Sequence, residues 1–440
     1  MPTKLKINFT PAMLTVAMIL SGCSSSEPGQ ENNNMERKNI ELTRAESDIA
    51  QSLYDFPVNL LAAAYAAEPG ENVVVSPLSV SMVLGMMANA MEPEDRQEIL
   101  DVLNIDETTI DDYNTLIQKL LAELPILDPQ ATLSLDNSFW ITDQGNPSPE
   151  YISLLSNFYK SEMEQFETFS LPIVDRINDW VKEKTKGAIP YILTDEDAGA
   201  DLKSLWLNTI YFKDGWTSKF DKSKTETKPF YTNYPETGMA DQVQMMYCDK
   251  VRYNYGFFSE GNTRNYDNAI NTVILPYGNE SFIFTAVLPP PNNPDIKFTL
   301  EKLDSEYWKK IDQVCSFEIE KGSDIVYLPK LNLTKLTDLI PVLRNTGVNQ
   351  IFDPSSGFNG QPHLGLGNGK DNSLSIGLFR QNVVLDVDED GSEIKVATAS
   401  GDWFYGDSPL EFNFNRPFIY FVRERSTGAV LLAGIYQHPE

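Results

Sequence analysis

Hydrophobic and polar positions along this 440-residue chain follow two different periods, and the strand period dominates its middle. Residues 133–141 (LSLDNSFWI) alternate with a period of two, which is typical of a half-buried strand. Residues 205–216 contain a continuous apolar run, which predicts a strand buried on both faces. Residues 271–277 and 282–288 predict further strands, so the chain carries at least one large sheet.

Helical spacing of apolar residues appears in other stretches. Residues 43–67 show it and end at a Pro-Gly stop signal. A helix is also predicted from Pro77 through Met91, with Ser76 as its N-cap and proline at the first helical position. Further predicted elements are helices at 151–158 and 173–184, a strand at 323–333, and a helix at 334–345 with Thr334 as a possible cap.

One long segment near the C-terminus does not fit either class. Residues 383–387 predict a strand, and an acidic turn follows it. The next twenty or so residues show no pattern that predicts a helix or a separate packed unit. Loops of that length are usually functional or disordered. From Ser392 onward, however, every second residue is apolar or small, and no proline occurs before Asp407. The segment is therefore interpreted as a loop that could become a strand. The alternative is a solvated surface connection.

Composition excludes several classes of protein. The apolar fraction of 41% suffices for a large core, and no internal repeat or second core is found. A net charge of −28 argues against nucleic acid as a partner, because binding phosphates needs clustered Lys and Arg. The acidity favours solubility, with electrostatic steering of basic partners as the alternative.

The scarcity of catalytic side chains argues against an enzyme. The two histidines are His363, in a Gly-rich stretch, and His438, two residues from the end, and neither position suits a Ser-His-Asp triad. The three cysteines lack metal-ligand spacing, and neither a metal nor another cofactor is predicted.

The N-terminus has the pattern of an export signal. Residues 1–22 carry two lysines and then an apolar run too short to span a bilayer, which predicts a signal peptide. The sequence Leu20-Ser21-Gly22-Cys23 resembles the lipobox of bacterial lipoproteins, which implies a lipid on Cys23 and a location on the bacterial cell envelope, at the outer membrane or cell surface. Residues 23–45 would be a flexible tether, and some twenty residues of it would reach roughly 25 Å. An ordinary signal peptide is the alternative, and export would allow a Cys248–Cys315 disulfide.

An ordered series of motifs resembles the serpin family over roughly residues 48–439. The motifs are NVVVSPLSVS (72–81), INDWVKEKTKGAI (177–189), LWLNTIYFKDGW (205–216), GVNQIFDPSSGFNG (347–360), the segment 384–418, and TGAVLLAG (427–434). The resemblance implies an α+β serpin fold for residues 46–440, with three β-sheets, eight or nine helices and an exposed reactive-centre loop.

The resemblance also implies a function. In serpins the loop presents a bait bond to a serine protease, forms a covalent acyl-enzyme, and inserts into a sheet as an extra strand once it is cut. We therefore expect a monomeric inhibitor of serine proteases rather than an enzyme. The alternatives are a non-inhibitory binding protein on the same fold and an inhibitor of papain-like cysteine proteases.

The resemblance assigns roles to residues of the loop. The hinge residues would be Glu389, Gly391, Ser392, Ile394 and Val396. Inhibitory relatives usually have alanines after the hinge, and the Ile-Lys-Val sequence here would slow or tune insertion rather than forbid it.

The bond that a protease attacks follows from counting along the loop. With Gly391 as the fifteenth residue before it, this bond joins Tyr405 to Gly406. Counting back from residues 416–418 gives Gly406–Asp407 instead. An aromatic Tyr405 favours proteases of chymotrypsin-like preference.

A second group of residues would control the opening of the sheet. The resemblance pairs Glu389 with Lys330 and places Trp216 over the point where insertion begins. It places other polar side chains beneath the strands that part. The opening-control residues are Lys330, Trp216, Ser76, Ser79, Asn208 and Gln381. At Gln381 many relatives have a histidine, for which amide hydrogen bonds could substitute.

Overall fold

The largest sheet among the described residues has fully buried strands at its centre. The computed structural model describes residues 36–199, 202–234, 240–258, 268–317, 322–353, 376–391 and 409–439. In this sheet the order is β1 (Val73–Val75), β15 (Val430–Tyr436), β14 (Phe418–Glu424), β9 (Phe282–Leu288), β8 (Ala269–Pro276) and β7 (Tyr253–Phe258). All of its pairs are antiparallel. Every residue of β9, β14 and β15 is buried, so these strands lie at the centre of the core.

The second sheet has four strands. Its order is β13 (Glu411–Asn413), β10 (Asp324–Pro329), β6 (Asp241–Val251) and β5 (Glu226–Phe230). Tyr327 of β10 lies opposite Tyr247 of β6, and their rings make an edge contact at 5.4 Å. β13 pairs with β10 in parallel, so the chain returns to this sheet directly after the long segment that was singled out above.

The remaining strands form two separate ladders among the described residues. One has the order β3 (Glu162–Phe166), β2 (Thr132–Thr142) and β4 (Ser204–Lys213), and the other pairs β11 (Leu331–Asp338) with β12 (Arg380–Val387). No ladder joins β4 to β12 in the described part of the chain. A single bridge between Gly215 and Gly391 connects the segments just beyond their ends.

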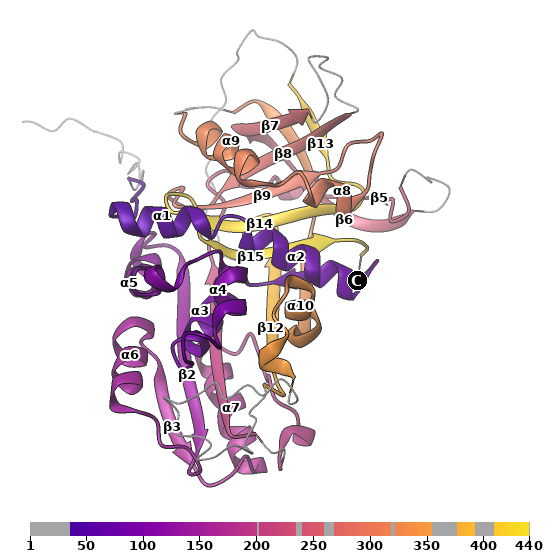
Figure 1. Cartoon of the computed structure of the whole chain (residues 1–440). Coiled ribbons are helices and arrows are strands. Elements are labelled where there is room, and N and C mark those ends of the chain that lie inside the picture. The colour runs from indigo at the N-terminus through magenta and orange to yellow at the C-terminus, as the bar shows by residue number, and fades with distance from the viewer. Residues whose placement is uncertain are drawn as a thin grey trace, which may run out of the picture. The chain divides into compact units, whose positions relative to one another are not determined.

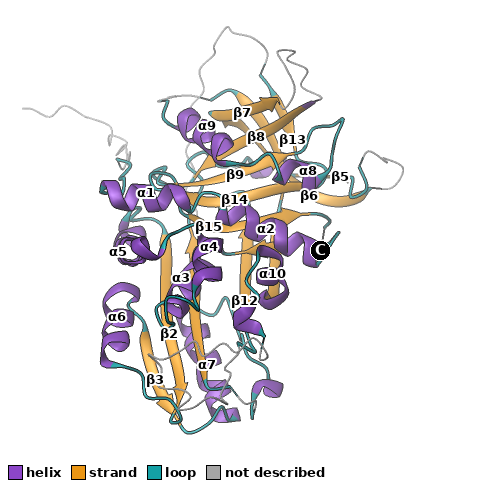
Figure 2. Ribbon diagram, in the orientation of Figure 1, coloured by secondary structure: helices purple, strands orange, loops and turns teal. Residues whose placement is uncertain are grey.

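Helices cover these sheets (Figures 1 and 2). They are α1 (Arg44–Ser52), α2 (Phe56–Ala67), α3 (Pro77–Ala88), α4 (Gln97–Leu103), α5 (Ile110–Glu123), α6 (Pro149–Tyr159), α7 (Leu171–Lys184), α8 (Ile296–Leu300), α9 (Ser305–Cys315) and α10 (Leu339–Thr346). α3 is buried along its whole length and packs against both β4 and β15. α2 packs against β15 and α10 (Figure 1).

Two of the predicted helices differ from the structure by more than a few terminal residues. The helix expected at 43–67 is broken between α1 and α2, and Thr43 caps α1 through a reciprocal pair of hydrogen bonds with Glu46. The helix expected at 334–345 is wrong in its first half, because β11 continues to Asp338 and pairs with β12 along its full length. Asp338, not Thr334, caps α10 by accepting a hydrogen bond from Ile340 N at 3.0 Å.

The connection after β4 also contains more structure than expected. Residues 213–230 contain many polar side chains, yet they end in β5. The strand expected at 323–333 is divided at Lys330 into β10 and β11, which belong to different ladders.

Contacts with the body of the protein begin before residue 46. Ile40 is buried and its N–H donates to Ser426 Oγ at 2.9 Å, while Ser281 Oγ donates to Lys38 O at 3.1 Å. The described end of the predicted tether, from residue 36 to 45, therefore packs against the domain.

The structure also bears on the export-related predictions. Cys248 and Cys315 are both buried and free, so the disulfide that export would allow is not formed. None of the helices described in this chain has the length and apolar content needed to cross a membrane. Residues 1–35, with Cys23, lie outside the described residues.

Candidate functional site

A cavity of about 190 Å³ separates β4 from β12. Its lining residues are Ala188, Ile189, Ile210, Tyr211, Phe212, Lys213, Val383, Val384, Leu385, Asp386 and Leu432. β4 is paired only with β2, and β12 only with β11, in the part of the chain that the structure describes. Two strand edges without a partner strand thus face each other across a cavity, which is the arrangement that an additional strand can complete.

The walls of the cavity are mainly apolar, and charge is confined to the end where β4 and β12 finish. Lys213 and Asp386 supply this charge. Burial raises the pKa of Asp386, nearby Asp388 raises it further, and Lys330 opposes both effects. The cavity is therefore charged at this one end and apolar along the rest of its length.

Glu389 and Lys330 lie together at the end of the cavity where Gly215 bridges to Gly391. Lys330 Nζ is 2.9 Å from Glu389 Oε2, and Thr225 Oγ1 donates to Glu389 Oε1 at 2.8 Å. Glu389 is only 6% exposed, and burial alone would raise its pKa, but the hydrogen bonds from Lys330 and Thr225 hold that pKa below its ordinary value. The pair links β12 to the residue between β10 and β11.

Trp216 lies in the same region, at the bridged end. Its indole ring stacks on Tyr277 with a centroid distance of 4.3 Å, and its Nε1 donates to Asp388 O at 2.8 Å. The backbone N–H of Trp216 also donates to Asp390 O at 3.1 Å. Trp216 therefore both packs in the core and fastens the turn that follows β12.

Glycine is required at position 391, where the chain after β12 meets the chain after β4. Its φ is +117°, a conformation that favours glycine. A Cβ at this position would lie 2.5 Å from Asp214 O and 2.6 Å from Gly215 Cα. A side chain at residue 391 would force the chain after β4 away from the chain after β12.

The N-terminus of α3 is bonded to β12 beneath the cavity. Gln381 Oε1 accepts from Ser76 N at 2.7 Å, and Gln381 Nε2 donates to Ser76 O at 3.2 Å. Ser76 Oγ donates to Ser79 Oγ at 2.9 Å and accepts from Ser79 N, as an N-cap does. The amide of Gln381 thus bonds to both the backbone N–H and the backbone C=O of Ser76.

The middle of the same helix reaches β4. Asn208 Nδ2 lies 3.4 Å from Met82 Sδ of α3 and donates to Asn137 Oδ1 of β2 at 2.9 Å. α3 therefore contacts both strands that border the cavity, β12 through Ser76 and β4 through Met82.

Some residues of this region were missed by the sequence analysis. Asp390 forms ion pairs with Lys219, at 3.6 Å, and with Lys222. The charges of the acidic turn and of the lysine-rich connection after β4 were visible in the sequence, but their proximity was not. Asp128 and Asp214 were missed as well.

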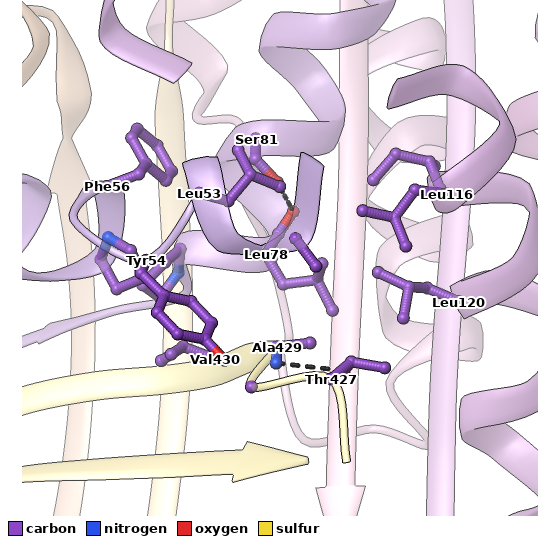
Figure 3. Close-up of a pocket in the computed structure, with 15 residues that line it drawn as sticks. Leu53, Tyr54, Phe56, Leu78, Ser81, Leu116, Leu120, Thr427, Ala429 and Val430 are labelled. Atoms are coloured by element: carbon purple, nitrogen blue, oxygen red, sulfur yellow. Dashed lines mark hydrogen bonds between the residues drawn. The ribbon is translucent and has the colours of Figure 1, made fainter. Parts of the chain in front are cut away.

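A second cavity, of about 50 Å³, lies between α1, α3, α5 and the turn before β15 (Figure 3). Its walls are almost entirely apolar. The hydroxyl of Tyr54 is engaged by Asp312 at 3.3 Å, and that of Ser81 by Leu78 O at 2.9 Å. With these polar groups already engaged, the cavity offers little to orient a ligand.

Several predicted site residues lie outside the described residues. These are Ser392, Ile394, Val396, Tyr405, Gly406 and Cys23. In the part of the chain that is described, no group of three or more His, Cys, Asp or Glu side chains could hold a metal ion.

Comparisons with known proteins identify relatives of the whole domain. The family model described as serpin (serine protease inhibitor) matches residues 51–439. Neuroserpin of Gallus gallus is 27% identical over 396 residues, which cover 89% of this chain and 92% of the relative. Leukocyte elastase inhibitor of Equus caballus is 27% identical over 395 residues, covering 87% and 97%.

Solved structures agree with the sequence relatives about the fold. Human glycosylated kallistatin superposes with a TM-score of 0.75 at 21% identity, covering 90% of this chain and 99% of that one. The predicted mixture of helices and sheets is thereby confirmed.

The Lys330–Glu389 contact generates a stability prediction. Lys330→Met would leave a buried carboxylate without its cationic partner, bonded to Thr225 and to its own backbone N–H, and we expect a loss of about 1–3 kcal/mol in the free energy of unfolding at neutral pH. Because the pKa of Glu389 is lowered in the folded protein, this difference should shrink as the pH falls through that lowered value.

Urea unfolding at several pH values measures this effect. The matched control is Lys224→Met, which removes half-exposed pairs with Asp221 and Asp249 and a contact with the Tyr247 ring, and it should lower the stability much less than Lys330→Met. If the two variants lose equal free energy of unfolding, the buried Lys330–Glu389 contact stabilises the protein no more than an exposed ion pair does.

Proposed function

The chain belongs to the serpin family, and from this premise we propose that it inhibits serine proteases by presenting residues 392–408 as bait and then inserting the part of this segment before the cut bond between β4 and β12. The family is one of protease inhibitors rather than enzymes. The observation that carries the proposal is the cavity between two strand edges that lack a partner strand.

The chain connectivity supports insertion at this place. β12 ends at Val387, the turn at residues 388–391 follows, and the proposed bait segment begins directly after Gly391. Gly391 already pairs with Gly215 beyond the end of β4. The bait would therefore enter the cavity from its bridged end, next to Glu389 and Trp216.

Energetics indicate what would drive the step. Ordering a residue costs about 1–2 kcal/mol, and each backbone hydrogen bond returns about 1 kcal/mol net. These two contributions nearly balance, so the burial of side chains decides the outcome. Ile394 and Val396 share the parity of Ser392 and would enter the apolar side, whereas Lys395 would remain in solvent.

The chemistry belongs to the target protease. Its nucleophilic oxygen attacks the carbonyl carbon of Tyr405, the bond to Gly406 nitrogen breaks, and an acyl-enzyme forms. Insertion of the cut segment then carries the acylated enzyme across the inhibitor and distorts its catalytic geometry before water can complete hydrolysis. A displacement of about 1 Å is already costly to catalysis.

Incubation with a chymotrypsin-like protease, followed by denaturing electrophoresis, tests this proposal. We expect a covalent complex that survives denaturation and a sharp rise in the thermal stability of the cleaved protein. Ser392→Arg should abolish both, because a charged side chain would have to be buried. Normal inhibition by this variant would contradict insertion, and clean cleavage of the unmodified protein without a complex would favour a non-inhibitory binding protein.

The specificity is proposed to be chymotrypsin-like because Tyr405 would fill a deep apolar pocket of the protease. Tyr405→Arg should shift inhibition from chymotrypsin-like toward trypsin-like enzymes. Mass spectrometry of the released C-terminal fragment tests the position of the bond, and a fragment beginning at Gly406 is expected. A fragment beginning elsewhere would refute this assignment, and complexes with papain-like enzymes alone would indicate a cysteine-protease inhibitor.

We also propose that the protein is exported and anchored to a bacterial cell envelope through a lipid on Cys23. The lipobox pattern Leu20-Ser21-Gly22-Cys23 supports this proposal. Cys23→Ser should move the protein from the membrane fraction to the soluble fraction after cell lysis. If the Cys23→Ser variant still partitions with the membrane fraction, the proposed lipid anchor is wrong.

A further inference from the structure

Two carboxylates are buried together beneath the bridged end of the cavity. Asp214, in the turn after β4, is 0% exposed, and Asp128, in the loop before β2, is 1% exposed. Both lie against Gly278 in the β8–β9 turn. A Cβ at residue 278 would touch Asp128 Oδ2 and would lie 3.0 Å from Asp214 Oδ1. Two acidic side chains from distant parts of the sequence thus share one small volume.

The two carboxylates differ in how they are hydrogen-bonded. Asp128 Oδ1 accepts from Gln130 N at 2.8 Å, and its Oδ2 accepts from Asn279 N at 2.6 Å. Asp214 Oδ1 accepts from Gly215 N at 2.8 Å, whereas its Oδ2 is buried and has no hydrogen-bond partner among the described residues. Asp128 is therefore equipped to hold a negative charge, and Asp214 lacks a donor for one oxygen.

No described cation pairs with either carboxylate. The charged and titratable groups on the neighbouring elements are Lys213, Lys219 and Lys222 after β4, Tyr277 and Glu280 in the β8–β9 turn, and Asp388, Glu389 and Asp390 in the turn after β12. Lys219 and Lys222 pair with Asp390, Lys330 with Glu389, and Arg252 and Arg425 with Glu280. Burial, with the charge of Asp128 added to it, raises the pKa of Asp214 to about 7.

Asp214 is also part of the closure of the cavity. The next residue, Gly215, forms the bridge to Gly391, and Gly215 O accepts from Gly278 N at 2.7 Å. The carbonyl oxygen of Asp214 lies against Gly391, so closely that no Cβ fits there. Any force that moves the Asp214 side chain away from Asp128 therefore acts on the contact between the two segments.

We propose that the buried pair Asp128–Asp214 takes up one proton, which is carried on Asp214, and that this proton keeps the end of the cavity closed at the Gly215–Gly391 bridge. A proton on Asp214 Oδ2 supplies the unpartnered oxygen with a hydrogen and removes the repulsion between two buried charges. Loss of the proton leaves two like charges in one buried volume, which favours separation of the turn after β4 from Gly391. This inference goes beyond the proposed inhibition and does not depend on it.

The direction of the pH effect follows from linkage. In the closed state Asp214 titrates near 7, and once the turn opens to water it should titrate near its ordinary value of about 4. The closed state thus binds the proton more tightly than the open state, and closure is weakened as pH rises between these values. Opening should become more frequent by up to about tenfold per pH unit from about pH 4 to about pH 7, and it should level off above that.

Native-state hydrogen exchange of the uncleaved, full-length protein measures the opening. The informative amides are Trp216 N, bonded to Asp390 O, and Phe220 N, bonded to Glu389 O, because both bonds cross the closure. Their protection factors, corrected for the intrinsic pH dependence of exchange, should fall through this range. Amides of β14 serve as the internal reference. No protease is present, so failure of the inhibition proposal cannot alter the result.

Variants assign the effect to the pair. Asp214→Asn, which mimics the protonated form, should keep these amides protected at every pH, and Asp128→Asn should move the step to lower pH. The matched control is Asp221→Asn, an exposed acid on the same connection, which should behave like the unmodified protein. A step that persists unchanged in Asp214→Asn would overturn the proposal. Protection that added Ca²⁺ restores at high pH would also overturn it, in favour of a bound cation.

Discussion

Backbone hydrogen bonding along β4 and β12 is the constraint on which this structure depends. A buried strand normally satisfies its N–H and C=O groups on both sides, yet each of these strands has a partner on one side only within the described chain. The cavity between them exposes groups that one more strand would satisfy. The surrounding contacts hold the two strands at the positions that leave this cavity between them.

Two sets of contacts hold the strands at either side of this cavity. Beneath it, α3 contacts β12 through Ser76 and β4 through Met82, so the two strands cannot move apart without disturbing one buried helix. At one end, Glu389 and Trp216 fasten the turn after β12 to the neighbouring segments. Both sets combine polar contacts with close packing, so they hold the two strands from more than one side.

The sequence predicted the strands well and the connections between them less well. Period-two alternation located β2, and apolar runs located β4, β8 and β9, because burial of one or both faces leaves a direct pattern. The helix predicted at 334–345 failed in part because pairing with β12 overrode local preference as far as Asp338. Family resemblance paired Glu389 with Lys330, which local pattern could not do, but it did not predict that Gln381 bonds to Ser76 at the start of α3.

Other features of the site were not accessible from one sequence. The sequences of β4 and β12 do not indicate that the two strands are separated, since each has the apolar pattern of a strand that is paired on both sides. The meeting of Asp128 with Asp214 depends on the path of the chain around Gly278, and a single acidic residue in a turn gives no signal of burial. Both the cavity and the pair of buried carboxylates therefore arise only from the tertiary arrangement.

The bridge between Gly215 and Gly391 has a consequence for the alignment of any strand that enters from this end. Gly391 is fixed against the chain after β4, so the distance along the chain to each later residue decides which face of the sheet it occupies. Strand geometry has a strict period of two, and a shift by one residue exchanges the faces. One added or deleted residue directly after Gly391 would turn Lys395 toward the apolar side and Ile394 toward water. Gly391 thus sets the register of the residues that follow it. The number of residues after it is constrained to remain even or odd, in addition to the constraint on which side chains they carry.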